Sequence, residues 1–263
     1  MKLSIIIPCY NEEKTIKPLL KNILQIKFPI EREIVVVDDG STRNHGDILK
    51  EEINSKKIKF IRLPRNQGKG IAIRIGLKYA SGNIFITQDA DFEYFPTDIP
   101  KLLEPILKHN ANVVYGSRFT KRPKDMSKSH FIANKILTKI TNFIYHTNLT
   151  DMETGYKVFT KRVLNNITLT TREFEFEPEI TSKIILKGFK IIELPINYKI
   201  RNFGRSKINW LDGLEGLLIL IKLRFCPNST FFQFVYEIYK FHAKKIIFSL
   251  TKFIAKHIYL RRI

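Results

Sequence analysis

Cysteine is scarce in this chain, which has only Cys9 and Cys226 among its 263 residues. The two lie far apart in the sequence and show none of the spacings typical of metal ligands. Two such residues do not make a disulfide framework or a zinc-binding motif. We therefore expect free thiols, as in proteins of a reducing compartment.

Long apolar runs are also missing. No run reaches the ~18 residues that a membrane-spanning helix needs. Residue 3 already begins an apolar stretch typical of a strand, with no signal peptide before it. Internal repeats and low-complexity segments are absent from the sequence as well. We therefore expect neither a spanning helix nor a repeat architecture.

Acidic residues are few relative to basic ones. The 25 Asp and Glu residues stand against 45 Lys and Arg residues, which gives a net charge of +20. Such a surface attracts anions: nucleic acids, nucleotide phosphates or an acidic membrane face. The composition is otherwise that of a globular protein, with 44% hydrophobic and 27% charged residues. The length suits one large α/β domain, or a domain with an appendage.

Apolar runs alternate with helical patterns over the first half of the chain. Short, nearly continuous apolar runs at 3–8, 33–37, 58–63 and 84–86 are typical of strands that are buried on both faces. Helical spacing follows the first three runs, at 12–25, 47–55 and 70–80. This alternation predicts an α/β fold with a mostly parallel, doubly wound sheet.

Polar side chains stand where the predicted strands end. Tyr10 follows the first strand, Asp39 the second, and Asp89 and Asp91 the fourth. In open α/β sheets, ligands bind outside the carboxyl ends of the strands. We therefore expect these residues to meet in one crevice, where the two carboxylates at 89 and 91 suit a hard divalent cation and a diphosphate.

The second half continues the pattern with two basic segments. We expect helices at 100–109, 131–145, 179–186 and 209–225, and strands at 113–118, 156–159 and 190–196. The segments 119–130 and 201–207 are rich in Lys and Arg and are predicted to be loops. The apolar stripe that recurs at helical spacing between 132 and 144 is expected to face the core. Cys226 and Pro227 mark a boundary between a domain at 1–225 and a tail at 226–263.

The tail has seven Lys or Arg residues against one acid, a net of +6, interleaved with aromatic residues. It is too charged to span a bilayer. The pattern predicts an amphipathic helix on an anionic membrane surface, with aromatic side chains in the interface. Docking to a protein or to nucleic acid is the alternative for this segment. On the membrane interpretation, the protein is peripheral, at the cytoplasmic face.

Seven short motifs in a fixed order give the chain a family resemblance over residues 3 to about 215. It resembles family 2 glycosyltransferases of the GT-A fold, most closely the dolichyl- or polyprenyl-phosphate mannosyl- and glucosyltransferases. The motifs are Ile7-Pro8-Cys9-Tyr10-Asn11-Glu12, Val37-Asp38-Asp39-Gly40-Ser41, Asn66-Gln67-Gly68-Lys69-Gly70, Gln88-Asp89-Ala90-Asp91, Gly116-Ser117-Arg118, the stretch 151–156, and Arg201 with Ser206-Lys207.

The resemblance implies a metal-dependent, inverting transfer of a hexose from a GDP- or UDP-sugar to a polyprenyl or dolichyl phosphate. The donor nucleotide would contact a set made of Pro8, Tyr10, Glu12, Asp39, Gly68 and Lys69, with Arg201 and Lys207 closing over its phosphates. Asp89 and Asp91 would hold Mg²⁺ or Mn²⁺, and Arg118 would bind the acceptor phosphate. Glu93 stands where relatives often carry Gln, so it is a third metal ligand, an acceptor contact or neither.

Other interpretations compete with this one. A sugar hydroxyl as acceptor needs a carboxylate to take its proton, and Asp151 and Glu153 are the candidates. Asp151 also suits a role in capping or bracing the turn before Gly155. A nucleic-acid-binding protein would explain the charge, but acids at the strand ends repel phosphates and no familiar motif is present. A nucleotidyltransferase is a third alternative, but this chain lacks the glycine-rich basic signature that such enzymes usually carry near residue 10. Lone histidines such as His45 and His109 are expected to have ordinary structural roles.

Overall fold

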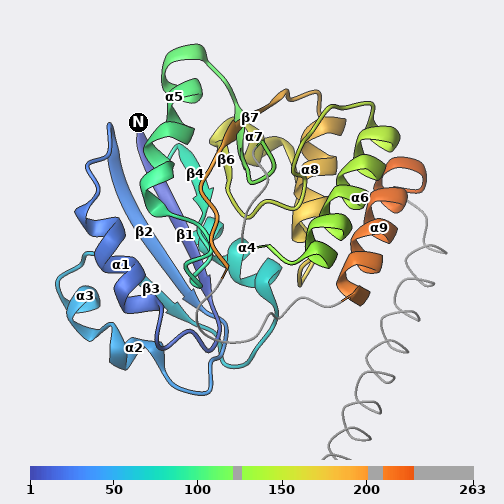
Figure 1. The fold of residues 1–263 in the computed structure, drawn as a ribbon. Helices are drawn as coiled ribbons and strands as arrows, with labels where there is room; N and C mark the ends of the chain where they lie inside the picture. The colour runs from blue at the N-terminus through green and yellow to red at the C-terminus, as the bar shows by residue number, and fades with distance from the viewer. Residues whose placement is uncertain (121–125, 201–209, 228–263) are drawn as a thin grey trace, which may run out of the picture.

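A mixed sheet of seven strands forms the centre of the protein in our computed structural model, which describes residues 1–120, 126–200 and 210–227 (Figure 1). The strand order is β3-β2-β1-β4-β6-β5-β7. The strands are β1 (Lys2–Cys9), β2 (Glu31–Asp38), β3 (Lys59–Arg62), β4 (Ile84–Thr87), β5 (Val113–Ser117), β6 (Lys157–Thr160) and β7 (Ile191–Pro195).

Strand β6 is the antiparallel member of this sheet. It pairs antiparallel with β4 and with β5, whereas β1, β2, β3 and β4 pair in parallel and β5 pairs in parallel with β7. The expected mostly parallel α/β sheet is therefore confirmed. Because β6 enters between β4 and β5, the turn before it at 151–156 lies beside the end of β4.

Helices cover both faces of the sheet, which explains the nearly continuous apolar strands. Helices α1 (Ile16–Gln25) and α5 (Ile99–His109) pack on one face, against side chains such as Ile5 and Val36. Helices α4 (Lys69–Tyr79), α7 (Lys161–Asn166) and α8 (Phe176–Leu186) pack on the other, against Ile6 and Val37. Alternate residues of β1 and β2 thus enter different cores.

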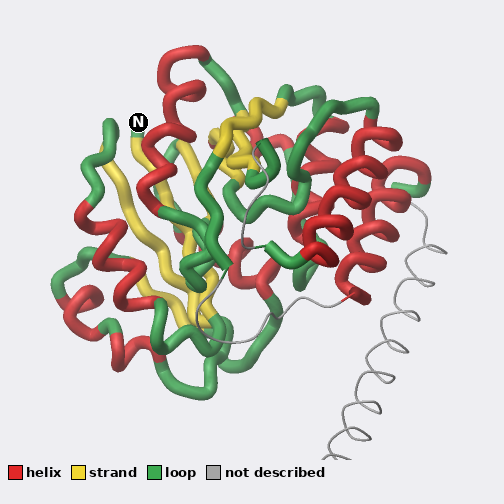
Figure 2. Tube along the Cα trace, viewed as in Figure 1, coloured by secondary structure: helices red, strands yellow, loops and turns green. Residues whose placement is uncertain are grey.

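Two further helices extend the second face beyond the sheet. Helix α6 (Lys128–Tyr145) and helix α9 (Trp210–Phe225) pack against each other and against α8, and the three lie side by side in Figures 1 and 2. The hydroxyl of Tyr145 donates to the carbonyl of Leu220 at 2.8 Å, which ties α6 to α9. Across the described ranges, no helix combines the length and apolarity needed to cross a membrane.

Much of the apolar stripe of α6 faces outward, so the expectation that it belongs to the core is wrong for three of its residues. Ile132, Ile136 and Phe143 are 55%, 51% and 82% exposed, whereas Ile144 packs against a small buried cluster that includes Tyr145. The buried side chains of this helix are Thr138, Thr141 and Tyr145. Periodicity identifies an apolar face of a helix, but it does not identify what that face contacts.

Some expected boundaries also shift. The first helix begins at Ile16 rather than near residue 12, and the helix expected at 47–55 is divided into α2 (His45–Ile48) and α3 (Lys50–Asn54). Helix α6 begins at Lys128, earlier than expected, because the hydroxyl of Ser127 accepts the His130 amide and caps it. Helix α7 and the 3-10 turn η1 (Pro96–Asp98) were not predicted. The basic loop 201–207 and the tail from 228 onward lie outside the described residues.

Candidate active site

A pocket of about 940 Å³ opens at the carboxyl ends of the strands. The predicted site residues come together there although five separate segments supply them. Those in its lining are Pro8, Tyr10, Glu12, Asp39, Gly68, Lys69, Asp89, Asp91, Glu93 and Arg118. The convergence expected from the strand ends is therefore present. Arg201 and Lys207 fall in the part of the chain that the structure leaves undescribed.

Asp39 holds the glycine turn that opens α4. Its Oδ1 accepts the Gln67 amide at 2.8 Å, and its Oδ2 accepts the Gly68 amide at 2.9 Å and the Asn66 side chain at 3.0 Å. Burial raises the pKa of Asp39, and these amide hydrogen bonds oppose the rise. Asp39 lines the pocket, and the hydrogen bonds that its carboxylate accepts hold the 66–68 turn in place.

Gly68 and Gly70 are required by a neighbouring segment of the protein. Gly68 has φ +103°, and a Cβ there would lie 2.4 Å from the Arg172 carbonyl oxygen. A Cβ at Gly70 would lie 2.9 Å from the carbonyl oxygen of Thr171. The glycines thus bring the start of α4 against the segment 171–173, which leads into α8. This contact carries the side chains of α8 to the floor of the pocket.

The acidic loop after β4 is balanced by Lys69. The Lys69 ammonium lies 2.8 Å from Asp89 Oδ1 and 2.9 Å from Glu177 Oε1. Burial lowers the pKa of Lys69, but the two carboxylates outweigh this effect and raise it well above its ordinary value. Lys69 is therefore a fixed cation at the loop that the sequence predicts to bind a metal.

The other two acids of this loop have different surroundings. Asp91 Oδ1 accepts the Glu93 amide at 3.1 Å. Phe92, between these two residues, has φ +62°. The Glu93 carboxylate accepts the Tyr198 hydroxyl at 3.3 Å. Glu93 is thus held against the segment that follows β7.

The acidic loop offers a donor set that fits a hard divalent cation. Carboxylate oxygens at 89 and 91 are the ligands that Mg²⁺ and Mn²⁺ take. Space beside Asp89 depends on Gly155, since a Cβ at that position would lie 2.5 Å from Asp89 Oδ2. The turn before β6 therefore needs glycine where it passes Asp89 Oδ2, while Lys69 contacts Oδ1.

A chain of buried charges continues from Lys69 into the protein. Glu177 Oε2 lies 3.6 Å from the ammonium of Lys157, whose side chain is fully buried and donates to the Met152 carbonyl at 2.9 Å. Glu153 lines the pocket nearby, and burial raises its pKa to about 7. The site therefore contains a carboxyl group that changes its protonation near neutral pH.

Arg118 and Asp151 form a buried, two-pronged ion pair at the end of β5. Arg118 Nε and Nη2 each lie 2.7 Å from a different Asp151 oxygen, and the Arg118 amide also donates to this carboxylate at 3.0 Å. Asp151 is fully buried, and Arg118 is 9% exposed and lines the pocket. The hydrogen bonds of Arg118 in the described residues use N, Nε and Nη2, so Nη1 is the nitrogen left for an anion.

The far end of the pocket lies between α6 and α9. Its lining there includes Ala133 and Leu137 of α6, and Gly213 and Gly216 of α9. Gly213 lies against Leu137, with 3.9 Å between an added Cβ and Leu137 Cδ1. The pocket thus joins the charged loops to a groove of small and apolar residues, called the apolar groove below, which polar side chains such as His130 and Asp212 also line.

Several residues of this site were not among the sequence predictions. Glu177 and Lys157 complete the charged chain around Lys69, and the Tyr94 hydroxyl accepts the Gly155 amide at 2.9 Å. Their positions depend on the contact between α4 and the segment 171–173 and on the insertion of β6. A charged residue in an otherwise apolar strand, such as Lys157, is the one sequence signal that could have indicated them.

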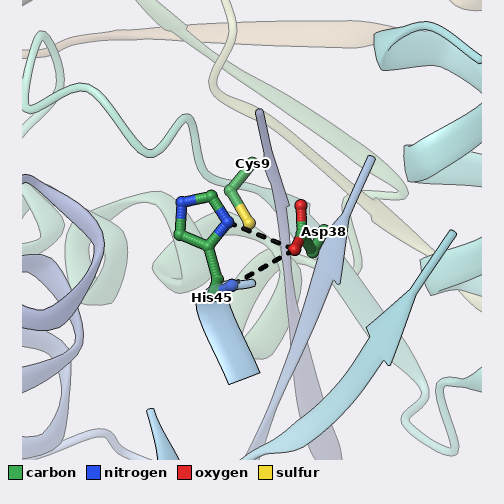
Figure 3. Close-up of side chains that lie close together, drawn as sticks. All are labelled: Cys9, Asp38 and His45. Carbon is green, nitrogen blue, oxygen red and sulfur yellow. Dashed lines mark hydrogen bonds and ion pairs between the residues drawn. The ribbon is translucent and has the colours of Figure 1, made fainter. Parts of the chain in front are cut away.

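A second cluster lies at the ends of β1 and β2. Cys9, Asp38 and His45 bring potential ligand atoms within 4.8 Å of one another, and all three are buried (Figure 3). Their separation in sequence hid this grouping, since they come from β1, β2 and the start of α2. Cys9 and Cys226 are both free thiols, as expected.

Two proteins of known sequence are similar to this chain over most of its length. A dolichol-phosphate mannosyltransferase of Pyrococcus furiosus is 32% identical over 235 residues, which cover 85% of this chain and 64% of that protein. A UDP-N-acetylglucosamine–dolichyl-phosphate N-acetylglucosaminyltransferase of Methanococcus voltae is 33% identical over 242 residues, covering 84% of this chain and 95% of that protein. This chain thus spans less than two thirds of the first relative.

Solved structures agree on the fold. Glucosyl-3-phosphoglycerate synthase from Mycobacterium tuberculosis, crystallised with Mn²⁺, UDP and glucosyl-3-phosphoglycerate, superposes with a TM-score of 0.69 at 18% identity. The match covers 87% of this chain and 81% of that one. A crystal structure of the same enzyme with Mg²⁺ and UDP gives a TM-score of 0.63. At this identity the likeness concerns the GT-A fold.

The family follows from a match over most of the described strands. The family model for glycosyl transferase family 2 matches residues 4–168, which hold β1 to β6, the acidic loop and Arg118. The relatives and the solved structures agree with it in fold and in class of enzyme. The chain therefore belongs to glycosyltransferase family 2 and is a glycosyltransferase of the GT-A fold.

Proposed function

We propose that this enzyme transfers a hexose from a GDP- or UDP-sugar to a polyprenyl or dolichyl phosphate, with inversion at the anomeric carbon. The observation that carries the proposal is the combination found in one pocket. The lining includes the carboxylates at 89 and 91, the Arg118 guanidinium, and small and apolar residues of α6 and α9. A phosphate with an apolar tail is the acceptor that matches this combination.

The donor nucleotide is assigned to the loops after β1, β2 and β3. Tyr10, Glu12 and Asp39 line this side of the pocket, and the 66–68 turn lies beside them. The solved neighbour that was crystallised with UDP supports a nucleoside diphosphate here. Arg201 and Lys207 are proposed to close over its phosphates, as the family resemblance implies.

The donor diphosphate is assigned to the acidic loop. Asp89 and Asp91 would hold Mg²⁺ or Mn²⁺ there, and the ion when bound would neutralise charge on the departing diphosphate. The Lys69 ammonium lies 2.8 Å from Asp89 Oδ1 and adds a second positive charge beside this carboxylate. Preorganised positive charge of this kind is commonly the largest contribution to catalysis.

The acceptor phosphate is assigned to Arg118. Asp151 fixes the guanidinium through Nε and Nη2, so that Nη1 is directed by a rigid brace rather than by a flexible side chain. Because Asp151 is engaged with Arg118 in this way, a positioning role suits it better than that of a general base. The brace keeps the cation in place before the anion arrives.

The reaction needs no proton transfer when the acceptor is a phosphate. An ionised phosphate oxygen forms a bond to the anomeric carbon, while the bond from that carbon to the diphosphate oxygen breaks. The electron pair leaves with the nucleoside diphosphate. Attack from the face opposite the leaving group converts an α-linked donor into a β-linked lipid phosphosugar.

Glu153 supports a second candidate function, in which the acceptor is a sugar hydroxyl. Such an acceptor must lose a proton, and Glu153 lines the pocket with a pKa raised by burial to about 7, suited to a general base. This alternative leaves the apolar groove without a purpose. For that reason the lipid phosphate is our first candidate.

A lipid acceptor also implies a place beside a membrane. The exposed side chains of α6 (Ile132, Ile136 and Phe143) lie on the helix that forms one wall of the apolar groove. We assign this face and the basic tail 226–263 to an anionic membrane surface, with the enzyme bound peripherally at the cytoplasmic face. Nucleic acid is not part of the proposal.

A donor screen tests the proposal. Purified enzyme is mixed with polyprenyl phosphate, Mn²⁺ and a panel of labelled GDP- and UDP-hexoses, and the label in extracted lipid is counted. One donor should label the lipid, and chelation of the metal should stop the transfer. Absence of transfer from every donor would contradict the proposal.

Matched variants test whether the transfer depends on the acidic loop. Asp89→Asn and Asp91→Asn should each abolish transfer while the melting temperature shows a folded protein. Asp47→Asn is the control, because this exposed residue lies on α2 and makes a local hydrogen bond to Asn44. Full transfer by both loop variants would remove the metal-binding role from them.

A further inference from the structure

His45 is fully buried between the first two nucleotide loops, where the sequence suggested only an ordinary structural histidine (Figure 3). Its Nε2 accepts the backbone amide of Glu12 at 3.2 Å. Its Nδ1 lies 3.3 Å from Asp38 Oδ2, without the alignment of a full hydrogen bond. The imidazole therefore connects the loop after β1 to the end of β2.

These contacts select one tautomer of the neutral ring. Because the Glu12 amide donates to Nε2, that nitrogen carries a lone pair and no hydrogen. The single hydrogen of the neutral ring then sits on Nδ1, facing the buried Asp38 carboxylate. Asp38 is itself fixed, since Oδ1 accepts the Ser41 amide at 3.0 Å and Oδ2 accepts the His45 amide at 3.4 Å.

This tautomer does not suit a metal ion in the cluster of Cys9, Asp38 and His45. An ion bound by Cys9, Asp38 and His45 would need the lone pair of Nδ1, which would move the ring hydrogen to Nε2. That hydrogen would then point at the Glu12 amide hydrogen. In addition, the Cys9 thiol is turned to the Val37 carbonyl, 3.5 Å away. The donor set fits a hydrogen-bonded ring rather than a metal ion.

The Glu12 amide that donates to His45 Nε2 belongs to the loop that forms one wall of the pocket. The Glu12 carbonyl accepts the amides of Thr15 and Ile16 and so begins α1, while its amide is held from behind by His45. On the other side of the loop, the Asn11 amide donates to the Ser41 hydroxyl at 2.9 Å, and Asn11 adopts φ +53°. Tyr10 and Glu12 line the pocket on either side of this strained residue.

We infer that His45 is a positioning residue for the donor nucleotide: through Nε2 it holds the Glu12 amide, and thereby the Tyr10 to Glu12 wall of the pocket. This inference rests on the proposed function, since it assigns the nucleotide to that wall. His45 does not line the pocket and acts through Glu12. The charged groups around the ring are Asp38 on β2 and Arg62 on β3, whose Nε lies 3.8 Å from Asp38 Oδ2.

Two amide substitutions separate the two contacts of the ring. In His45→Gln, the side-chain oxygen reaches the position of Nε2 and accepts the Glu12 amide. In His45→Asn, the shorter side chain keeps a donor for Asp38 but leaves the Glu12 amide without an acceptor. Loss of one buried hydrogen bond should weaken binding of GDP or UDP, measured by calorimetry with Mn²⁺, about tenfold in His45→Asn, with little change in His45→Gln. In transfer assays the donor KM should rise while kcat changes less.

Amide hydrogen exchange supplies a readout that needs no ligand. Exchange at Glu12 should accelerate in His45→Asn and stay slow in wild type and in His45→Gln, while exposed His109→Asn serves as the control. Equal losses of binding in both variants, in step with lower melting temperatures, would reduce His45 to a structural residue and overturn the inference. So would wild-type affinity in His45→Asn, or a bound zinc ion that this substitution removes. If wild type itself binds neither nucleotide while the exchange result holds, the proposed function fails and the contact to Glu12 stands.

Discussion

Replacing Asp151 by Asn tests how the acceptor cation is held. The substitution keeps the shape of the side chain but removes the charge that faces Arg118 and turns one oxygen of the two-pronged pair into a donor. Breaking a buried ion pair on one side costs about 3–5 kcal/mol. Arg118 keeps the Asn134 side chain at 3.2 Å and the Phe119 ring at 5.1 Å, so we expect the lower end, a loss of about 3 kcal/mol.

Denaturant unfolding and calorimetry measure this loss. For a chain of this size, about 3 kcal/mol corresponds to a melting temperature lower by roughly 6–12 °C. The KM for the acceptor should rise more than the KM for the donor, because Arg118 is the group assigned to the acceptor phosphate. Glu104→Gln on α5 is the matched control: it removes one charge from an exposed pair with Lys108 and should leave unfolding unchanged. A loss below about 1 kcal/mol in Asp151→Asn would refute the brace.

Three further predictions follow from the pocket and its rim. Burial raises the pKa of Glu153 from 4.5 to about 7, so wild type should lose at most about 3 kcal/mol of stability relative to Glu153→Gln as pH rises from 4.5 to 7, measured by denaturant unfolding; a constant difference would contradict the shift. Gly155→Ala places a Cβ 2.5 Å from Asp89 Oδ2 and should weaken Mn²⁺ binding about tenfold in calorimetry, whereas unchanged affinity would place the metal elsewhere. Ile136→Ser with Phe143→Ser should slow transfer to a long-chain polyprenyl phosphate but not to a short, water-soluble analogue; the control is Tyr79→Ser, and equal effects on both acceptors would remove the lipid role of α6.

The sign of the Glu153 prediction follows from linkage. Between pH 4.5 and 7 the unfolded chain has released the proton of this carboxyl group, while the folded protein still holds it. Folding is therefore favoured by protons in this window, and the contribution is present below 4.5 and lost as pH rises through about 7. Asp38 behaves in the opposite way. Burial opposes ionisation there, but hydrogen bonds from His45 and Ser41 outweigh it and lower its pKa to about 2, so its contribution is lost only as pH falls toward 2.

Much of the sheet and of the pocket could be predicted from the sequence because both depend on local patterns. Continuous apolar runs identify strands that are covered on both faces, and the topology of an α/β sheet brings Asp39, Asp89 and Arg118 to one edge. The same patterns located the acidic loop and Asp151. The roles that the sequence allowed for Asp151 were a general base and a brace of the turn before Gly155, so its ion pair with Arg118 was not predicted.

Contacts between distant segments could not be predicted in this way. Lys69 meets Glu177 across 108 positions of sequence, because Gly68 and Gly70 bring α4 against the segment 171–173. The outward face of α6 was misjudged because this helix buries Thr138, Thr141 and Tyr145, while Ile132, Ile136 and Phe143 stay exposed. His45 was set aside because a single histidine has no pattern, and its meaning depends on the Glu12 amide.

Identifying which acceptor receives the sugar tests the central claim most directly. Enzyme, Mn²⁺ and the donor found in the screen are offered a polyprenyl phosphate, the matching polyprenol and a free glycan, and the products are identified by mass and by the anomeric configuration of the sugar. The account predicts transfer to the phosphate alone, as a β-linked phosphosugar from an α-linked donor, at a rate that Glu153→Gln leaves unchanged. Transfer to a hydroxyl of the glycan, lost in Glu153→Gln, would contradict it.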